Sequence, residues 1–119
     1  MEFVKLPHNH GHSIEKIDFA SKEKECQNMA DIFKLLGDST RIRIFWILCH
    51  YEECVINLAA LLKMTSPAIS HHLKQLKICG LITNRREGKE VYYKAADTKE
   101  AKLMHQMIEN FLEITCPQK

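Results

Sequence analysis

Residues Thr65 to Ile78 read T-S-P-A-I-S-H-H-L-K-Q-L-K-I, and this stretch decides the fold of the chain. Thr65 predicts a helix N-cap, and Pro67 fits the first turn, where a missing N–H costs little. Apolar side chains recur on one face at helical spacing: Ile69, Leu73, Leu76 and Ile78. The opposite face is polar or basic, with no acidic residue: Ser66, Ser70, His71, Lys74 and Lys77. Such a helix suits a DNA major groove, although an ordinary solvated amphipathic helix has the same pattern.

The flanking segments favour the DNA-binding interpretation. A short helix, Ile56 to Lys63, precedes this stretch across a two-residue turn, which is a helix-turn-helix arrangement. After Cys79-Gly80 the sequence reads as a strand over residues 81–86, a charged turn with one glycine, and a second strand over residues 90–94. A basic hairpin after a helix-turn-helix is a winged helix, so we predict an α+β fold that is mostly helical.

The remaining residues divide into an arm and additional helices. Residues 1–21 predict a flexible, histidine-bearing N-terminal arm, and residues 22–119 predict the winged-helix and dimerisation domain. A first helix from Lys22 ends at Gly37, and Asp38 or Ser39 caps a second, nearly all-apolar helix. Asp97 is expected to cap a last helix that reaches about residue 115. Its broad apolar face, with the first helix, predicts a homodimer interface, or it closes the chain's own core.

Composition places the chain among single-domain intracellular proteins. The chain has 119 residues and a net charge of +2. Seven basic and two acidic residues lie between Lys63 and Lys94, which is the local positive charge that a duplex requires. Five cysteines without a scaffold spacing indicate reduced thiols and a cytoplasmic location. We expect no signal peptide and no membrane partner, because the longest apolar run is far too short. We also expect no enzyme, because no catalytic motif is recognisable.

Four segments together resemble the ArsR/SmtB family of bacterial winged-helix repressors. They are L-L-G-D-S-T-R-I-R-I (residues 35–44), E-E-C-V-I-N-L-A-A-L-L (52–62), S-P-A-I-S-H-H-L-K-Q-L (66–76) and R-R-E-G-K-E-V-Y-Y (85–93). The resemblance covers the chain from about Ala30 onward. It implies a homodimer that binds double-stranded operator DNA and represses transcription until an inducer releases it.

The resemblance also assigns candidate DNA contacts. Ser66, Pro67, Ser70 and His71 match positions from which family members touch the operator, and Lys74 lies on the same face. Pro67 replaces a residue that is usually polar in the family. Arg85, Arg86 and Lys89 fall on the predicted wing, where they would hold phosphates or reach a minor groove.

The family's metal site on the terminal helices is degenerate in this chain. Its four positions correspond to Asp97, Lys99, Asn110 and Glu113, so lysine and asparagine stand where the family has histidines. A protonated lysine cannot ligate a cation. Lys99 could instead pair with Glu113 of the second protomer. His105 and Glu109 lie one helical turn apart, but a pair supplies only two ligands.

A second family metal site would use the start of the helix before the turn, together with the arm. Cys54 keeps one of the family's two thiolates there, and the arm offers three histidines. We therefore predict a site for Zn²⁺ or a similar divalent ion built from Cys54, His8, His10, His12 and Cys26. The alternative is a solvated arm without a specific metal site.

Two further hypotheses need no metal. Some members of the family sense persulfides or oxidants through one cysteine on the second helix and one on the last, and Cys49 and Cys116 occupy such places. Cys49 also lies in an apolar run, where a thiol can be inert packing. Alternatively, the chain is a ligand-independent winged-helix DNA-binding module that has lost its sensing function.

Overall fold

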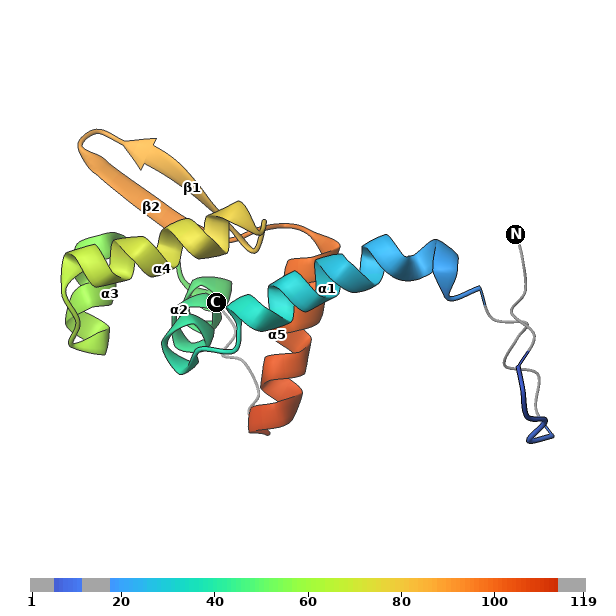
Figure 1. Cartoon of the computed structure of the whole chain (residues 1–119). Helices are drawn as coiled ribbons and strands as arrows, with labels where there is room; N and C mark the ends of the chain where they lie inside the picture. Colours follow the sequence, from blue (N-terminus) through green and yellow to red (C-terminus); the bar gives the residue numbers. More distant parts are fainter. Residues whose placement is uncertain (1–5, 12–17, 114–119) are drawn as a thin grey trace.

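The computed structural model describes residues 6–11 and 18–113 and shows a group of helices from which a two-stranded hairpin projects (Figure 1). A short 3-10 helix, η2 (Ala20–Lys22), leads into α1 (Glu23–Leu35), and α2 (Ser39–His50) follows after Gly37. Next come α3 (Val55–Leu62) and α4 (Ser66–Ile78), then β1 (Ile82–Glu87), β2 (Glu90–Ala95) and finally α5 (Lys99–Leu112). The predicted winged helix-turn-helix is confirmed in this order of elements.

Side-chain caps explain where the helices begin. The Asp38 carboxylate accepts from the Arg41 backbone N–H at 3.1 Å, and the Thr65 hydroxyl accepts from the Ala68 N–H at 3.3 Å. Asp38 is therefore the cap of α2. Asp97 does not cap the last helix, because the Thr98 hydroxyl accepts from the Ala101 N–H at 3.2 Å. The prediction for that cap was wrong by one residue, and Asp97 instead pairs with Lys102 at 2.9 Å.

The hydrophobic core lies between α2, α3, α4 and the base of the hairpin. Phe45 and Ile44 of α2 are fully buried, as expected for a helix that is apolar on most sides. They pack in one cluster with the apolar faces of the neighbouring elements, which supply Leu58, Ile69, Leu73, Leu76, Leu81 and Ile82. This core fixes the α3–α4 unit and leaves the polar face of α4 outside.

The hairpin pairs antiparallel with Ile82 opposite Ala95 and Glu87 opposite Glu90. Gly88 in its turn has φ +63°, a backbone conformation that glycine adopts without steric cost. A third segment joins the hairpin at its base, because the backbones of Glu53 and Tyr93 exchange two hydrogen bonds of 3.0 and 2.8 Å. The link between α2 and α3 is thus tied directly to the wing.

The last helix ends earlier than predicted. Residue 113 has φ +55° and closes α5 after Leu112, whereas the predicted helix continued to about residue 115. Residues 114–119 lie outside the described part of the chain. No helix among the described residues is long and apolar enough to span a bilayer.

Candidate functional site

The exposed face of α4 is the first candidate surface. Ile69 and Leu73 anchor the helix in the core, so the opposite face is turned to solvent. That face carries the predicted contact residues, all of them exposed: Ser66, Pro67, Ser70, His71 and Lys74. No acidic side chain interrupts it, so a phosphate backbone can approach without like-charge repulsion.

A contact between helices fixes the orientation of α4. The Arg41 Nε on α2 donates to His72 Nδ1 at 3.1 Å, and Arg41 Nη1 donates to the Leu35 carbonyl at 3.3 Å. Burial is the main reason that the pKa of His72 lies below its ordinary value, which favours the neutral, accepting imidazole. His72 is therefore partly buried against α2, while His71 beside it is exposed.

The cations on the wing have different surroundings. Arg85 donates to both carboxylate oxygens of Glu52 at 2.9 and 2.7 Å and to Glu87 at 2.6 Å. Its guanidinium also lies 4.9 Å from the centre of the Tyr92 ring. Arg86 and Lys89 are exposed, and within the described part of the chain neither forms an ion pair. These two cations are therefore better placed to meet phosphates than Arg85.

The predicted metal ligands near the N-terminus do not meet in the described chain. His8 and His10 stack with ring centroids 6.0 Å apart. Cys54 is the N-cap residue of α3, and Figure 1 shows α3 and residues 6–11 at opposite ends of the molecule. Cys26 is exposed on α1, and His12 lies outside the described residues. This ligand set remains a prediction.

The terminal-helix positions lack a ligand set in this structure. The Asp97 carboxylate forms an ion pair with Lys102, and the Asn110 side-chain oxygen accepts a hydrogen bond from Gln106 at 2.9 Å. Lys99 and Glu113 are exposed at opposite ends of α5. Because Lys99 and Asn110 offer no imidazole, these four positions do not form the family's carboxylate–histidine site.

Of the two cysteines predicted to form a thiol switch, the structure describes Cys49, whereas Cys116 lies outside the described residues. Cys49 is half-buried near the end of α2. Burial and, to a lesser extent, the nearby Glu109 carboxylate together raise the pKa of its thiol to about 12. A thiol that stays protonated at neutral pH is a poor nucleophile, so Cys49 lacks the environment typical of a redox sensor.

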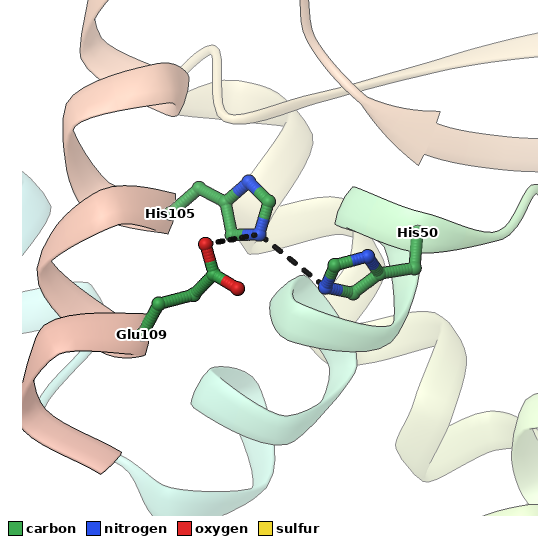
Figure 2. A group of neighbouring side chains, drawn as sticks. All are labelled: His50, His105 and Glu109. Carbon is green, nitrogen blue, oxygen red and sulfur yellow. Dashed lines mark hydrogen bonds and ion pairs between the residues drawn. The ribbon is translucent and has the colours of Figure 1, made fainter. Parts of the chain in front are cut away.

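A group of potential metal ligands lies where the sequence predicted only a pair. Figure 2 shows His50 at the end of α2 facing His105 and Glu109 of α5. The two Nε2 atoms are 3.3 Å apart, and His105 Nε2 lies 3.7 Å from Glu109 Oε1. All three ligand atoms fall within 4.8 Å of one another. The i, i+4 spacing of His105 and Glu109 was visible in the sequence, but no sequence signal linked them to His50.

Large apolar side chains remain exposed on α1 and on the outer face of α5. Met29 and Phe33 project from α1, and Phe111 of α5 is 87% exposed. Leu103 and Met107 lie on the same side of α5 and are exposed as well. A concentration of exposed apolar side chains on two helices is typical of an interaction site.

The comparisons with known proteins agree with this architecture. Residues 38–84 match the family model described as bacterial regulatory protein, arsR family. A transcriptional repressor SmtB homolog from Synechocystis is 36% identical over 75% of this chain and 67% of its own length. A cadmium resistance transcriptional regulatory protein CadC homolog from Staphylococcus aureus is 38% identical over 70% of this chain and 72% of its own. The solved structure of a homodimeric winged helix-turn-helix DNA-binding domain from Mycobacterium bovis superposes with a TM-score of 0.69 and 25% identity, covering 88% of this chain and 91% of that one.

Proposed function

The chain belongs to the ArsR family of bacterial regulatory proteins and is a DNA-binding transcriptional repressor; we propose that it acts as a homodimer that a divalent metal ion releases from its operator. The observation that carries the DNA-binding part is the exposed face of α4. Its core-facing side is fixed by Leu73 and by the Arg41–His72 contact, so the outer side is presented rigidly. A rigid helix with a neutral-to-basic outer face suits the major groove.

The contacts fall into two classes. Ser70 and His71 lie on the exposed face of α4 and supply hydrogen-bonding groups for base edges, with Ser66, Pro67 and Lys74 beside them. Arg86 and Lys89 hold phosphates from the wing. Arg85 stays engaged with Glu52 and Glu87 and sets the position of the wing, so its own contact with DNA is the weakest of the set.

Dimerisation supplies the symmetry that an operator reads. The exposed apolar residues of α1 and α5, with Phe33 and Phe111 among them, form the surface that two protomers bury against each other. A two-fold dimer presents two α4 helices and requires a palindromic site whose half-sites are about one helical turn, or a multiple, apart. Reduced cysteines favour a cytoplasmic location for such a regulator.

Metal as the inducer is supported by ligand chemistry and by the relatives. One relative is named for cadmium resistance, and this chain offers imidazoles, thiols and carboxylates suited to Zn²⁺-like ions. The thiol-switch alternative with Cys49 and Cys116 is weaker, because the raised pKa of Cys49 disfavours the thiolate. Metal binding would disfavour the spacing of the two α4 helices that fits DNA.

Fluorescence anisotropy on an operator selected from a random duplex pool tests this proposal. We expect tight binding by reduced, metal-free protein and release by zinc or cadmium. The variants Ser70→Ala and His71→Ala are expected to lose affinity for the selected site, and Glu25→Gln on exposed α1 serves as the matched control. Failure to select any duplex would refute operator binding. Release by an organic persulfide instead of metal would support the thiol switch.

A further inference from the structure

We propose that His50, His105 and Glu109 form a binding site for a Zn²⁺-like divalent ion that joins α2 to α5 and regulates the wing. The three residues come from two helices that the chain brings together only by folding, and their ligand atoms converge on one point (Figure 2). The site shares no residue with the terminal-helix positions or the N-terminal set. Its regulatory part rests on the function proposed above, but metal binding does not.

The geometry matches the chemistry of zinc. Two nitrogens that each lie about 2.05 Å from a tetrahedral ion are about 3.3 Å apart. The Nε2 atoms of His50 and His105 are 3.3 Å apart. The His105 Nε2 to Glu109 Oε1 distance of 3.7 Å is only slightly longer than that spacing, and a glutamate rotamer covers the difference. Two imidazoles and one carboxylate select zinc-like ions over Ca²⁺ or Mg²⁺, and they leave a fourth position for water.

The Glu109 carboxylate lacks a full set of hydrogen bonds within the described part of the chain. A proton on His105 Nε2 can point to His50 or to Glu109, but it cannot bond both well. The second carboxylate oxygen of Glu109, Oε2, is buried without a hydrogen-bond partner. The Glu109 side chain is only 16% exposed, and a largely buried carboxylate with one unsatisfied oxygen is costly. A cation at the centre of the group would compensate this carboxylate, and the two imidazoles would be its further ligands.

The position of the site connects it to both DNA-binding and dimer surfaces. Two residues after His50, Glu52 holds Arg85 of the wing, and Glu53 pairs with the Tyr93 backbone. On the other side, α5 carries the exposed apolar face that includes Phe111. An ion that fixes the end of α2 against α5 therefore acts on the base of the wing and on the dimer surface together.

Titration with Co²⁺, which reports its coordination by visible absorption, tests the site without DNA. Reduced protein comprising residues 1–119 is expected to bind one Co²⁺ per chain and to give the absorption spectrum of a four-coordinate ion, and Zn²⁺ is expected to displace the Co²⁺. Glu109→Gln and His105→Gln should each weaken Zn²⁺ binding, measured by chelator competition, by more than about 100-fold, since loss of an outer-shell partner alone costs 10–100-fold.

Matched controls separate this site from others. Glu100→Gln removes an exposed carboxylate from the same helix, and a variant with alanine at positions 8, 10 and 12 removes the arm histidines; both should keep the Co²⁺ spectrum. Circular dichroism checks that each variant is folded. If His105→Gln does not fold, Glu109→Gln still tests the site, because glutamine has nearly the same shape as glutamate. Equal metal affinity in wild type and Glu109→Gln would overturn the site, as would loss of the spectrum only in the arm variant.

The regulatory part has its own readout. Zn²⁺ should weaken operator binding by about 5–150-fold in the wild type and leave Glu109→Gln unaffected. Zinc bound at this group without any change in operator affinity would overturn the regulatory part. If metal-free protein selects no operator at all, the function proposed above fails, while the Co²⁺ result still decides the metal site.

Discussion

Replacing Arg86 with alanine tests how the wing meets DNA. Arg86 is exposed and, within the described residues, forms no ion pair, so its charge is available to a phosphate. A dimer carries the change twice, and each lost phosphate contact reduces the slope of log K against log salt by about 0.9. The slope should therefore become less negative by about 1.8. Between about 50 and 200 mM salt, the wild type should lose about tenfold more affinity than the variant.

Arg85→Ala is the matched comparison, because it removes the same charge from the adjacent position. The Arg85 guanidinium is already neutralised by Glu52 and Glu87, so its removal should leave the salt slope nearly unchanged. Affinity should fall by the same factor at every salt concentration, because the wing loses its tie to the α2–α3 link. Anisotropy titrations across a KCl series measure both slopes. A wild-type slope in Arg86→Ala, or equal slope changes in the two variants, would refute this reasoning.

Three further perturbations follow from the packing, the caps and the exposed face. Leu73→Ala should lower the free energy of unfolding by about 2–5 kcal/mol in urea denaturation, because Leu73 is fully buried in the core; a loss below 1 kcal/mol would contradict that packing. Asp38→Ala should cost about 1 kcal/mol at neutral pH. The hydrogen bond from the Arg41 N–H holds the pKa of Asp38 below its ordinary value, so this cost should vanish as the pH falls through that lowered pKa, and a pH-independent difference would exclude the cap as its cause. Phe111→Glu should weaken the dimer at least about tenfold in sedimentation velocity, whereas unchanged self-association would place the interface elsewhere.

The structure also changes the weight of the sensing hypotheses. The arm set of Cys54 and three histidines stays a prediction, because the described chain does not bring those residues together. The thiol hypothesis loses support at Cys49, whose pKa is raised by burial. The strongest candidate for an inducer site is now the group of His50, His105 and Glu109. His50 follows Cys49 in the sequence, but it offers an imidazole ligand for a metal ion at the junction of α2 and α5, whereas Cys49 offers a thiol.

Local rules predicted the elements well, with an error where two cap residues compete. Thr65 was identifiable as a cap, and Asp38 as one of two candidates beside Ser39, because the capping hydrogen bond joins residues three apart in sequence. Asp97 and Thr98 are both good cap residues, and only the path of the chain after β2 decides that the Thr98 hydroxyl reaches the Ala101 N–H. Hydrophobic periodicity likewise located the first helix, in which Ile32 is buried whereas Phe33 beside it is exposed. A periodic stripe does not say which part faces the chain's own core and which part faces a partner.

By itself, the sequence determined the winged helix-turn-helix, the polar, solvent-exposed side of α4 and the membership of the family, because these depend on residues close together in the chain. Tertiary structure alone decided two features of the site. It placed Glu52 on Arg85, 33 residues away, so that two adjacent arginines differ in their availability to DNA. It also placed His50 against His105, 55 residues away, because α2 packs on α5. Sequence spacing encodes contacts within one helix, whereas contacts between helices depend on how their apolar faces pack.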